Sequence, residues 1–350
     1  MTSEEIRRID PSEMHKCIMD FPSQAEEAYS IGKSAAVPIR SATLTSVLIT
    51  GLGGSAIGGD LLRAYLADEI RVPITVNRHY TLPEFVGKKT LVIVSSYSGN
   101  TEETISAQKE ATKRKAKVLC ISTGGAVTEF ARKHKQPCIK IPGGLQPRAA
   151  LGYSFFPLLV ALSKVGFIRA KDKDIKETLA MLRRRVADLG NPESDSNPAL
   201  ELAKRIQGRL PIIYSSSHQL DAVNLRWRGQ IEENAKQLAY GNLFPEMNHN
   251  ELVGWNMLRD LLSKTFVVFL RDKGEHRRVS VREEITKRIV SEYASGITEV
   301  HSDGKSLLTR MFSLIQFGDW VSFYLAILNN QDPTPVKAID YLKTQLAGVK

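Results

Sequence analysis

The chain has 350 residues, of which 42% are hydrophobic and 25% are charged, a balance typical of a globular protein with room for about two domains. The sequence shows neither a run of about 18 apolar residues nor an apolar N-terminal segment, so we expect no membrane span, no signal peptide and a cytoplasmic protein. The net charge of +10 is spread over separate segments without nucleic-acid-binding motifs, which favours solvated helix surfaces over nucleic-acid binding.

The order of the predicted elements indicates an α/β protein. A helical lead-in covers residues 1–40, after which short β-branched runs alternate with longer helical stretches, a pattern of parallel sheets with crossover helices. Strands are expected at 45–50, 74–78, 90–96, 117–122, 138–142, 210–216, 265–270 and 297–302. We therefore predict two doubly wound parallel-sheet domains in tandem at 41–165 and 200–330, with a polar linker at 190–199 and a C-terminal helix at 333–350.

The loop GLGGSAIGGD follows the first predicted strand and opens a helix, with Gly54 and Ser55 at the helix start. Glycines let the backbone approach an anion closely, and a helix N-terminus favours negative charge. The loop also fits the dinucleotide pattern G-x-G-x-x-G/A, but the second strand ends in Asn77 and Arg78 instead of the expected acidic residue. This disfavours NAD and leaves NADP as a minor alternative.

A second loop, SSYSGNTEET, follows the strand at 90–96 and places Ser96, Ser98 and Thr101 between that strand and a helix. An alternative for Ser98 or Thr101 is a purely structural role as a helix cap. Capping does not require three hydroxyl groups together with Ser55 at the carboxyl ends of neighbouring strands, where open α/β sheets bind ligands. We expect these groups to bind a phosphate. No Walker-type lysine is present, so a nucleoside triphosphate is not expected.

Three cysteines, Cys17, Cys120 and Cys138, are odd in number and lack metal-ligand spacing. We expect reduced, buried thiols, no disulfide framework and no metal site.

These loops, together with LQPRAALGYSFFPLL, RWRGQIEENAKQLAYGNLFPEMNHNELVGW and DPTPVKAIDYLK, resemble the bifunctional phosphoglucose/phosphomannose isomerase family, whose members contain two sugar isomerase (SIS) domains. The resemblance covers nearly the whole chain with the segments in the family's order. It implies interconversion of glucose 6-phosphate and mannose 6-phosphate with fructose 6-phosphate through a cis-enediol, without a metal or organic cofactor, by a homodimer.

Such a reaction needs a base beside C1 and C2, positive charge near the developing oxyanion and a group that opens the sugar ring. Helical spacing alone does not choose between Glu232 and Glu233, and the resemblance implies Glu233, which directly precedes Asn-Ala-Lys. The resemblance also implies that Arg148 faces the enediolate. It further implies that Lys343 helps ring opening, with Lys337 as the alternative.

His249 lies in MNHNELVGW, where we expect Asn248 to cap a helix and Glu251 to complete a capping box. A histidine on the first helical turn would be kept neutral, which suits a proton shuttle for ring opening. The resemblance implies that His249 reaches the active site of the neighbouring subunit.

Substrate range is expected to depend on Val336, seven residues before Lys343. Glucose-specific relatives have a glutamine there, and the shorter valine leaves space for both epimers at C2, although neighbouring Thr334 is an alternative for that position. Two further interpretations are compatible with the sequence. One is a phosphosugar sensor without activity, which would not need Glu233, His249, Arg148 and Lys343. The other is an isomerase of a different phosphosugar.

Overall fold

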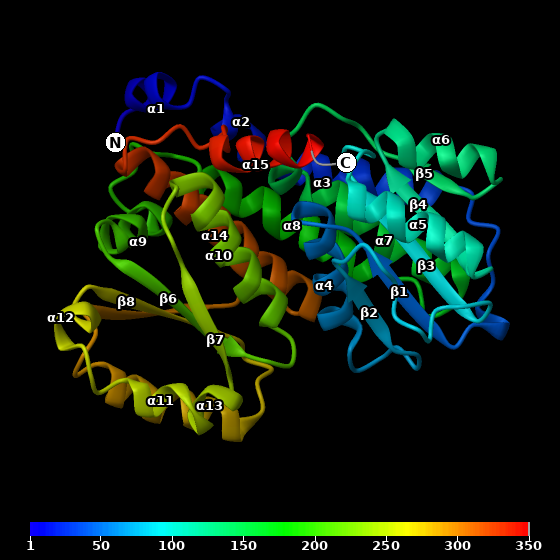
Figure 1. Ribbon diagram of the computed structural model, residues 1–350. Helices are drawn as coiled ribbons and strands as arrows, with labels where there is room; N and C mark the ends of the chain where they lie inside the picture. Colours follow the sequence, from blue (N-terminus) through cyan, green and yellow to red (C-terminus); the bar gives the residue numbers. More distant parts are fainter. Residues whose placement is uncertain (349–350) are drawn as a thin grey trace.

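Two parallel β-sheets form the framework of the computed structural model, which describes residues 1–348 (Figure 1). The first sheet has the strand order β2-β1-β3-β4-β5 and the second the order β7-β6-β8-β9, with all neighbours parallel. The strands are β1 Ser46–Thr50, β2 Ile74–Asn77, β3 Thr90–Ser96, β4 Lys117–Ser122, β5 Cys138–Lys140, β6 Leu210–Ser216, β7 Tyr240–Phe244, β8 Thr265–Arg271 and β9 Gly296–His301.

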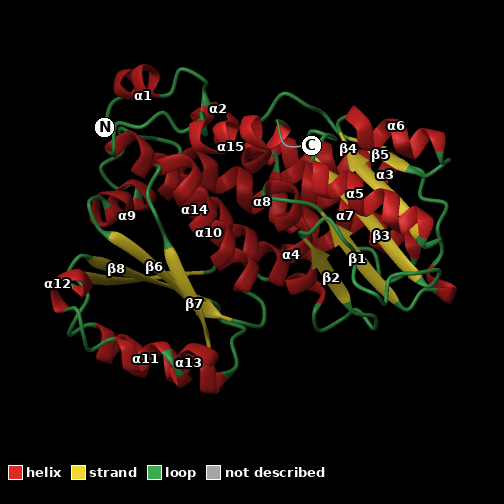
Figure 2. Ribbon diagram, viewed as in Figure 1, coloured by secondary structure: helices red, strands yellow, loops and turns green. Residues whose placement is uncertain are grey.

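Helices surround both sheets (Figure 2). In the first half of the chain they are α1 Ser3–Ile9, α2 Met14–Met19, α3 Phe21–Ser34, α4 Gly54–Leu66, α5 Glu102–Lys113, α6 Gly125–Lys133, α7 Leu151–Val165 and α8 Asp172–Leu189. The second half contains α9 Pro198–Ile206, α10 Asp221–Ala235, α11 Glu251–Gly254, α12 Arg259–Leu262, α13 Arg277–Val290, α14 Leu307–Leu328 and α15 Lys337–Ala347. Three short 3-10 helices are η1 Ser41–Thr43, η2 Pro147–Ala149 and η3 Glu246–His249.

Each central strand of the first sheet is buried on both faces, as expected of a parallel sheet between helical layers. Side chains alternate between the faces, so Val47 and Ile49 of β1 join the core formed with α3, α4 and α7. Leu48 of β1 points the other way and packs in a smaller core with Ala107 of α5 and Val127 of α6.

The second sheet is arranged in the same manner. Ile213 and Val268 join the same large core as the first sheet, through α9, α10 and α14. Tyr214 and Phe269 lie on the opposite face, in a separate cluster that includes Val290 of α13. The two sheets therefore share one central helical layer, in which α4 of the first half contacts α10 of the second (Figure 1).

Helix α14 lies in this central layer. By length and composition alone it could cross a membrane, contrary to the expectation that no apolar run is long enough, but 94% of its most apolar segment is buried inside the protein. It is the core helix of the second half.

Comparison with the predicted elements confirms all eight expected strands to within two residues at either end. Strand β7 was not predicted, since Tyr240–Phe244 lies at the edge of its sheet, is mostly half-exposed and contains Gly241 and Asn242 in place of β-branched residues. The predicted C-terminal helix at 333–350 begins only at Lys337, after the prolines, and residues 349–350 lie outside the described residues.

Candidate active site

The glycine-rich loop after β1 brings α4 close to η2, which carries Arg148. Gly53 precedes α4 with a left-handed φ of 52°. A Cβ added to Gly54 would lie 2.4 Å from the carbonyl oxygen of Pro147, so only glycine permits this approach. The loop thereby places the backbone of Arg148 at the N-terminus of α4.

The predicted phosphate-binding hydroxyl groups lie at the carboxyl ends of β1 and β3. Ser55 is buried, and its Oγ accepts a hydrogen bond of 3.0 Å from the backbone N–H of Tyr97, which ties the two loops together. Ser96 is also buried. Its Oγ accepts from the N–H of Gly99 and donates to Oγ1 of Thr101 at 3.4 Å.

Thr101 is the N-cap residue of α5, but its side chain makes no capping hydrogen bond. Ser98 is exposed, and its Oγ accepts only from the N–H of Asn100 among the described residues. Capping of α5 therefore does not account for either hydroxyl group. Both remain available at a helix N-terminus whose first N–H groups need acceptors.

Arg148 is buried, with 3% of its side chain exposed, and it joins the two halves of the chain. Its Nε donates to Oδ1 of Asn234 at 2.7 Å, and its Nη1 donates to Oε2 of Glu233 at 3.3 Å. Its Nη2 donates to the carbonyl oxygens of Pro333 at 2.5 Å and Thr334 at 2.7 Å. Burial lowers the pKa of Arg148, which the negative charge of Glu233 partly opposes. With an ordinary value of 12.5, the guanidinium stays charged at neutral pH.

Helix α10 presents Arg226, Gln230 and Glu233 on one face, because residues four and three positions apart align along a helix. Arg226 is buried in an ion pair of 2.7 Å with Asp319 of α14, and it also donates to the carbonyl oxygen of Arg148 at 3.1 Å. Gln230 donates to the same Asp319 at 3.0 Å. Burial raises the pKa of Asp319, and Arg226 acts against that shift. This network fixes both the helix face and the backbone of Arg148.

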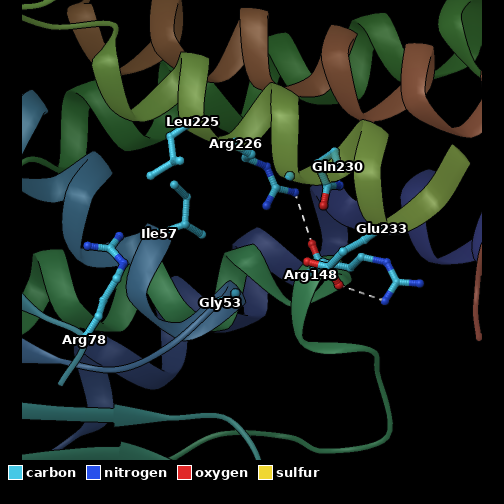
Figure 3. Close-up of a pocket in the computed structure, with 10 residues that line it drawn as sticks. Gly53, Ile57, Arg78, Arg148, Leu225, Arg226, Gln230 and Glu233 are labelled. Atoms are coloured by element: carbon cyan, nitrogen blue, oxygen red, sulfur yellow. Dashed lines mark hydrogen bonds and ion pairs between the residues drawn. The ribbon is translucent and has the colours of Figure 1, made fainter. Parts of the chain in front are cut away.

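A cavity of about 180 Å³ lies between α4 and α10 (Figure 3). Glu233 and Arg148 lie together at one end of the view, and Arg78 and Ile57 approach from the other side. The full lining is Gly53, Gly54, Ile57, Arg78, Arg148, Leu225, Arg226, Gly229, Gln230 and Glu233. The side chain of Glu233 is 33% exposed, so it is accessible to a ligand, while Glu232 faces solvent outside the lining.

The structure thus brings Arg148, Glu233 and Gly54 together in one cavity. Ser55, Ser96, Ser98 and Thr101 lie at adjacent strand ends, outside the lining of that cavity. Lys337 and Lys343 are exposed on α15, Val336 is half-buried directly before this helix, and His249 is exposed in η3. None of these last four residues lines the cavity within the described single chain.

The expected capping box around His249 is wrong. Asn250, not Asn248, is the N-cap of α11, and its side chain accepts from the N–H of Glu251. Glu251 instead accepts hydrogen bonds from the hydroxyl group of Tyr214 and the amide of Asn242. His249 therefore precedes α11 and does not lie on its first turn.

Several residues of the site were not singled out from the sequence. Asn234 and Lys236 lie in the segment ENAK, and Arg226 and Gln230 lie in RWRGQ. Family resemblance pointed to both segments but implied no role for these four residues. No group of three or more His, Cys, Asp or Glu residues that could hold a metal occurs among residues 1–348.

Comparison with known proteins gives matches along the whole chain. Residues 195–346 match the bacterial phospho-glucose isomerase C-terminal SIS domain. A bifunctional phosphoglucose/phosphomannose isomerase of Caldicellulosiruptor bescii is 47% identical over 339 residues, which cover 96% of this chain and 100% of that protein. One of the same name from Thermoplasma acidophilum is 39% identical and covers 88% of this chain and 92% of its own length.

Among solved structures, a hypothetical protein from Thermus thermophilus superimposes with a TM-score of 0.75 at 16% identity, covering 99% of this chain and 93% of its own. That likeness concerns the fold. Together with the two parallel sheets, these matches confirm the predicted fold class of two tandem SIS domains. The predicted domain boundaries stay predictions.

Proposed function

Because the chain belongs to the bifunctional phosphoglucose/phosphomannose isomerase family, we propose that it interconverts glucose 6-phosphate and mannose 6-phosphate with fructose 6-phosphate. The observation that carries the proposal is the pairing of Glu233 with Arg148 at 3.3 Å, from opposite halves of the chain, at the edge of one cavity. A carboxylate and a permanently charged guanidinium side by side suit proton transfer next to a developing oxyanion.

In this mechanism Glu233 removes the proton from C2 of the open-chain aldose and returns it to C1, through a cis-enediolate, while the hydroxyl proton on O2 moves to O1. Arg148 stabilises the negative charge on the enediolate oxygens without exchanging protons itself. Asn234, Pro333 and Thr334 hold the guanidinium in place, so little reorganisation is needed when charge develops.

The phosphate group is proposed to bind at the hydroxyl groups of Ser96, Ser98 and Thr101, with the backbone at Gly54 and the hydroxyl of Ser55 completing the site. The absence of a capping role for Ser98 and Thr101 supports this assignment. An anion at this position is also favoured by the N-terminus of α5.

We propose that ring opening uses His249 and Lys343 in a homodimer, with His249 supplied to the active site of the partner subunit. His249 is exposed and lies outside its own chain's cavity, as such sharing requires. Large apolar side chains nearby are also exposed, as expected of a surface that a second copy covers. They are Val253, Met257, Leu258 and Leu261.

Substrate range is proposed to depend on the segment before α15. Val336 is half-buried there, and the hydroxyl oxygen of neighbouring Thr334 is buried without a hydrogen-bond partner among the described residues. Both side chains lie within three residues of Pro333, which is bonded to Arg148, so either is placed to affect which epimer is accepted.

The test is an assay of metal-stripped protein in excess chelator with each of the three phosphosugars in turn. We expect all three to be converted and chelator to have no effect. Absence of turnover with every substrate would overturn the proposal in favour of a phosphosugar sensor. Turnover of glucose 6-phosphate without mannose 6-phosphate would overturn the dual specificity.

A further inference from the structure

Three lysines at helix ends have a left-handed backbone: Lys115 after α5, Lys135 after α6 and Lys236 after α10, with φ values of 60°, 55° and 55°. Side chains of L-residues are strained in this conformation, and glycine is the usual residue. Lys115 and Lys135 are exposed, and their side chains make no hydrogen bond within residues 1–348. Lys236 differs from both in what its side chain contacts.

The ammonium group of Lys236 contacts the main chain of the residue that carries the proposed base. Its Nζ donates to the main-chain carbonyl oxygen of Glu233 and, at 3.1 Å, to that of Pro333. The same oxygen of Pro333 accepts from Nη2 of Arg148 at 2.5 Å. Two cations, one from each half of the chain, therefore converge on the carbonyl oxygen of Pro333, in the segment that precedes α15.

This convergence is electrostatically unfavourable for Lys236. Although the residue as a whole is exposed, removal of its ammonium group from water and the positive charge of Arg148 lower the pKa of Lys236 to about 8. Asp332 and Glu233 act in the opposite direction without restoring the ordinary value of 10.5. A lysine that only satisfied the last carbonyl groups of α10 would not need to approach a buried guanidinium.

We propose that Lys236 is a positioning residue of the active site, an inference that rests on the proposed isomerase function. It holds the end of α10, which carries Glu233, against the segment at Pro333 that also binds Arg148. Its charge adds to that of Arg148 beside the enediolate. The alternative is a lysine that merely caps α10.

Glycine substitution separates these two roles. Lys236→Gly, Lys115→Gly and Lys135→Gly each relieve a left-handed lysine, so each is expected to leave the melting temperature unchanged or raise it by about 1–3 °C. With fructose 6-phosphate as substrate, we expect kcat to fall tenfold or more only in Lys236→Gly. The other two variants are matched controls and should keep the wild-type kcat.

A Lys236→Gly protein with wild-type kcat would overturn the inference and leave Lys236 as a helix cap. A wild-type protein without any isomerase activity would overturn the proposed function itself, so the two failures are distinguishable.

The pH profile provides a second readout that does not depend on the glycine variant. Wild-type kcat should decline as pH rises through about 8, because the ammonium group then loses its proton. Lys236→Arg keeps its charge and should extend activity to higher pH, whereas Lys236→Met should lose activity at every pH. An alkaline decline that is identical in wild type and Lys236→Arg would overturn the inference.

Discussion

Replacement of Glu233 by glutamine is the most direct test of the proposed chemistry. The amide keeps nearly the size of the carboxylate and retains an oxygen that can accept a hydrogen bond from Nη1 of Arg148. In the wild-type protein this nitrogen lies 3.3 Å from Oε2 of Glu233. What it loses is the ability to take a proton from carbon. General-base groups contribute about 10²–10⁴ in rate, so we expect kcat to fall by that factor, roughly 2.7–5.4 kcal/mol in activation free energy.

The fold should tolerate this change. Arg148 keeps its bonds to Asn234, Pro333 and Thr334, so the buried guanidinium is not left without partners. The side chain of Glu233 is 33% exposed, and solvent screening limits the value of its ion pair. We therefore expect the free energy of unfolding to change by less than about 1 kcal/mol.

The assay combines turnover, substrate binding and deuterium incorporation from heavy water into the sugar, followed by NMR. Glu233→Gln should bind fructose 6-phosphate nearly as wild type does, with incorporation lost in step with turnover. The matched control is Glu232→Gln, one position earlier on α10 and facing solvent, which should behave as wild type. Normal turnover in Glu233→Gln, or an equal loss in Glu232→Gln, would refute the assignment of the base.

Three other outcomes are expected. Ser98→Ala combined with Thr101→Ala should raise KM about tenfold or more and change kcat less, because hydrogen bonds to charged groups contribute roughly 1.5–3 kcal/mol each. A pure loss of kcat would contradict phosphate binding at these two residues. Mixed His249→Ala and Glu233→Gln proteins should regain activity as hybrid dimers, and no recovery despite measured subunit exchange would argue against a shared histidine. Glu283 is buried on α13, where burial and the neighbouring carboxylate of Glu275 raise its pKa from 4.5 to about 9, although the ion pair with Arg271 at 2.8 Å opposes that shift. The folded state therefore holds this proton more tightly than the unfolded chain, stability falls as pH rises from about 4.5 to 9, and Glu283→Gln should flatten that decline in urea unfolding.

The adjacent residue on α13 supplies a control of opposite sign for the last prediction. Hydrogen bonds from Lys287 and Arg271 lower the pKa of Glu284 from 4.5 to about 2. Its stabilising contribution is present above pH 4.5 and is lost as pH falls towards 2, so Glu284→Gln should change the acid side of the stability profile instead. A Glu283→Gln protein with the same slope between about pH 4.5 and 9 as wild type would show that the buried carboxyl group does not carry the effect.

The positions of the strands could be predicted because parallel strands buried on both faces appear as β-branched runs, as in TLVIVSS. The positions of the loops after β1 and β3 were also predictable, since each follows such a strand and precedes a helix. Ligand binding by these loops, at the carboxyl ends of their strands, stays a prediction. Strand β7 was missed for the converse reason: an edge strand with Gly241 and Asn242 lacks that pattern.

Local sequence patterns do not predict contacts between residues that are far apart in the chain. The role proposed for Arg148 rests on family resemblance, but its bonds to Asn234, Pro333 and Thr334 join residues 86, 185 and 186 positions apart. Nothing in the spacing of QPRAAL predicts those partners. The expected cap at Asn248 failed similarly, because its side-chain amide bonds to Thr286 of α13, which lies 38 positions later.

The hydrogen bonds of Arg148 indicate how a buried charge can remain available for chemistry. A guanidinium has five N–H groups, and Asn234, Pro333, Thr334 and Glu233 take four of them. Only Nη1, the nitrogen that faces Glu233, keeps an N–H without a partner among residues 1–348. In the proposed mechanism the enediolate oxygen must therefore accept a hydrogen bond from Nη1, the nitrogen that also binds Glu233. This places the carbon that loses its proton next to the oxygen on which the charge develops. Adjacent sugar carbons meet that requirement, since C2 loses its proton while the charge develops on the neighbouring carbonyl oxygen.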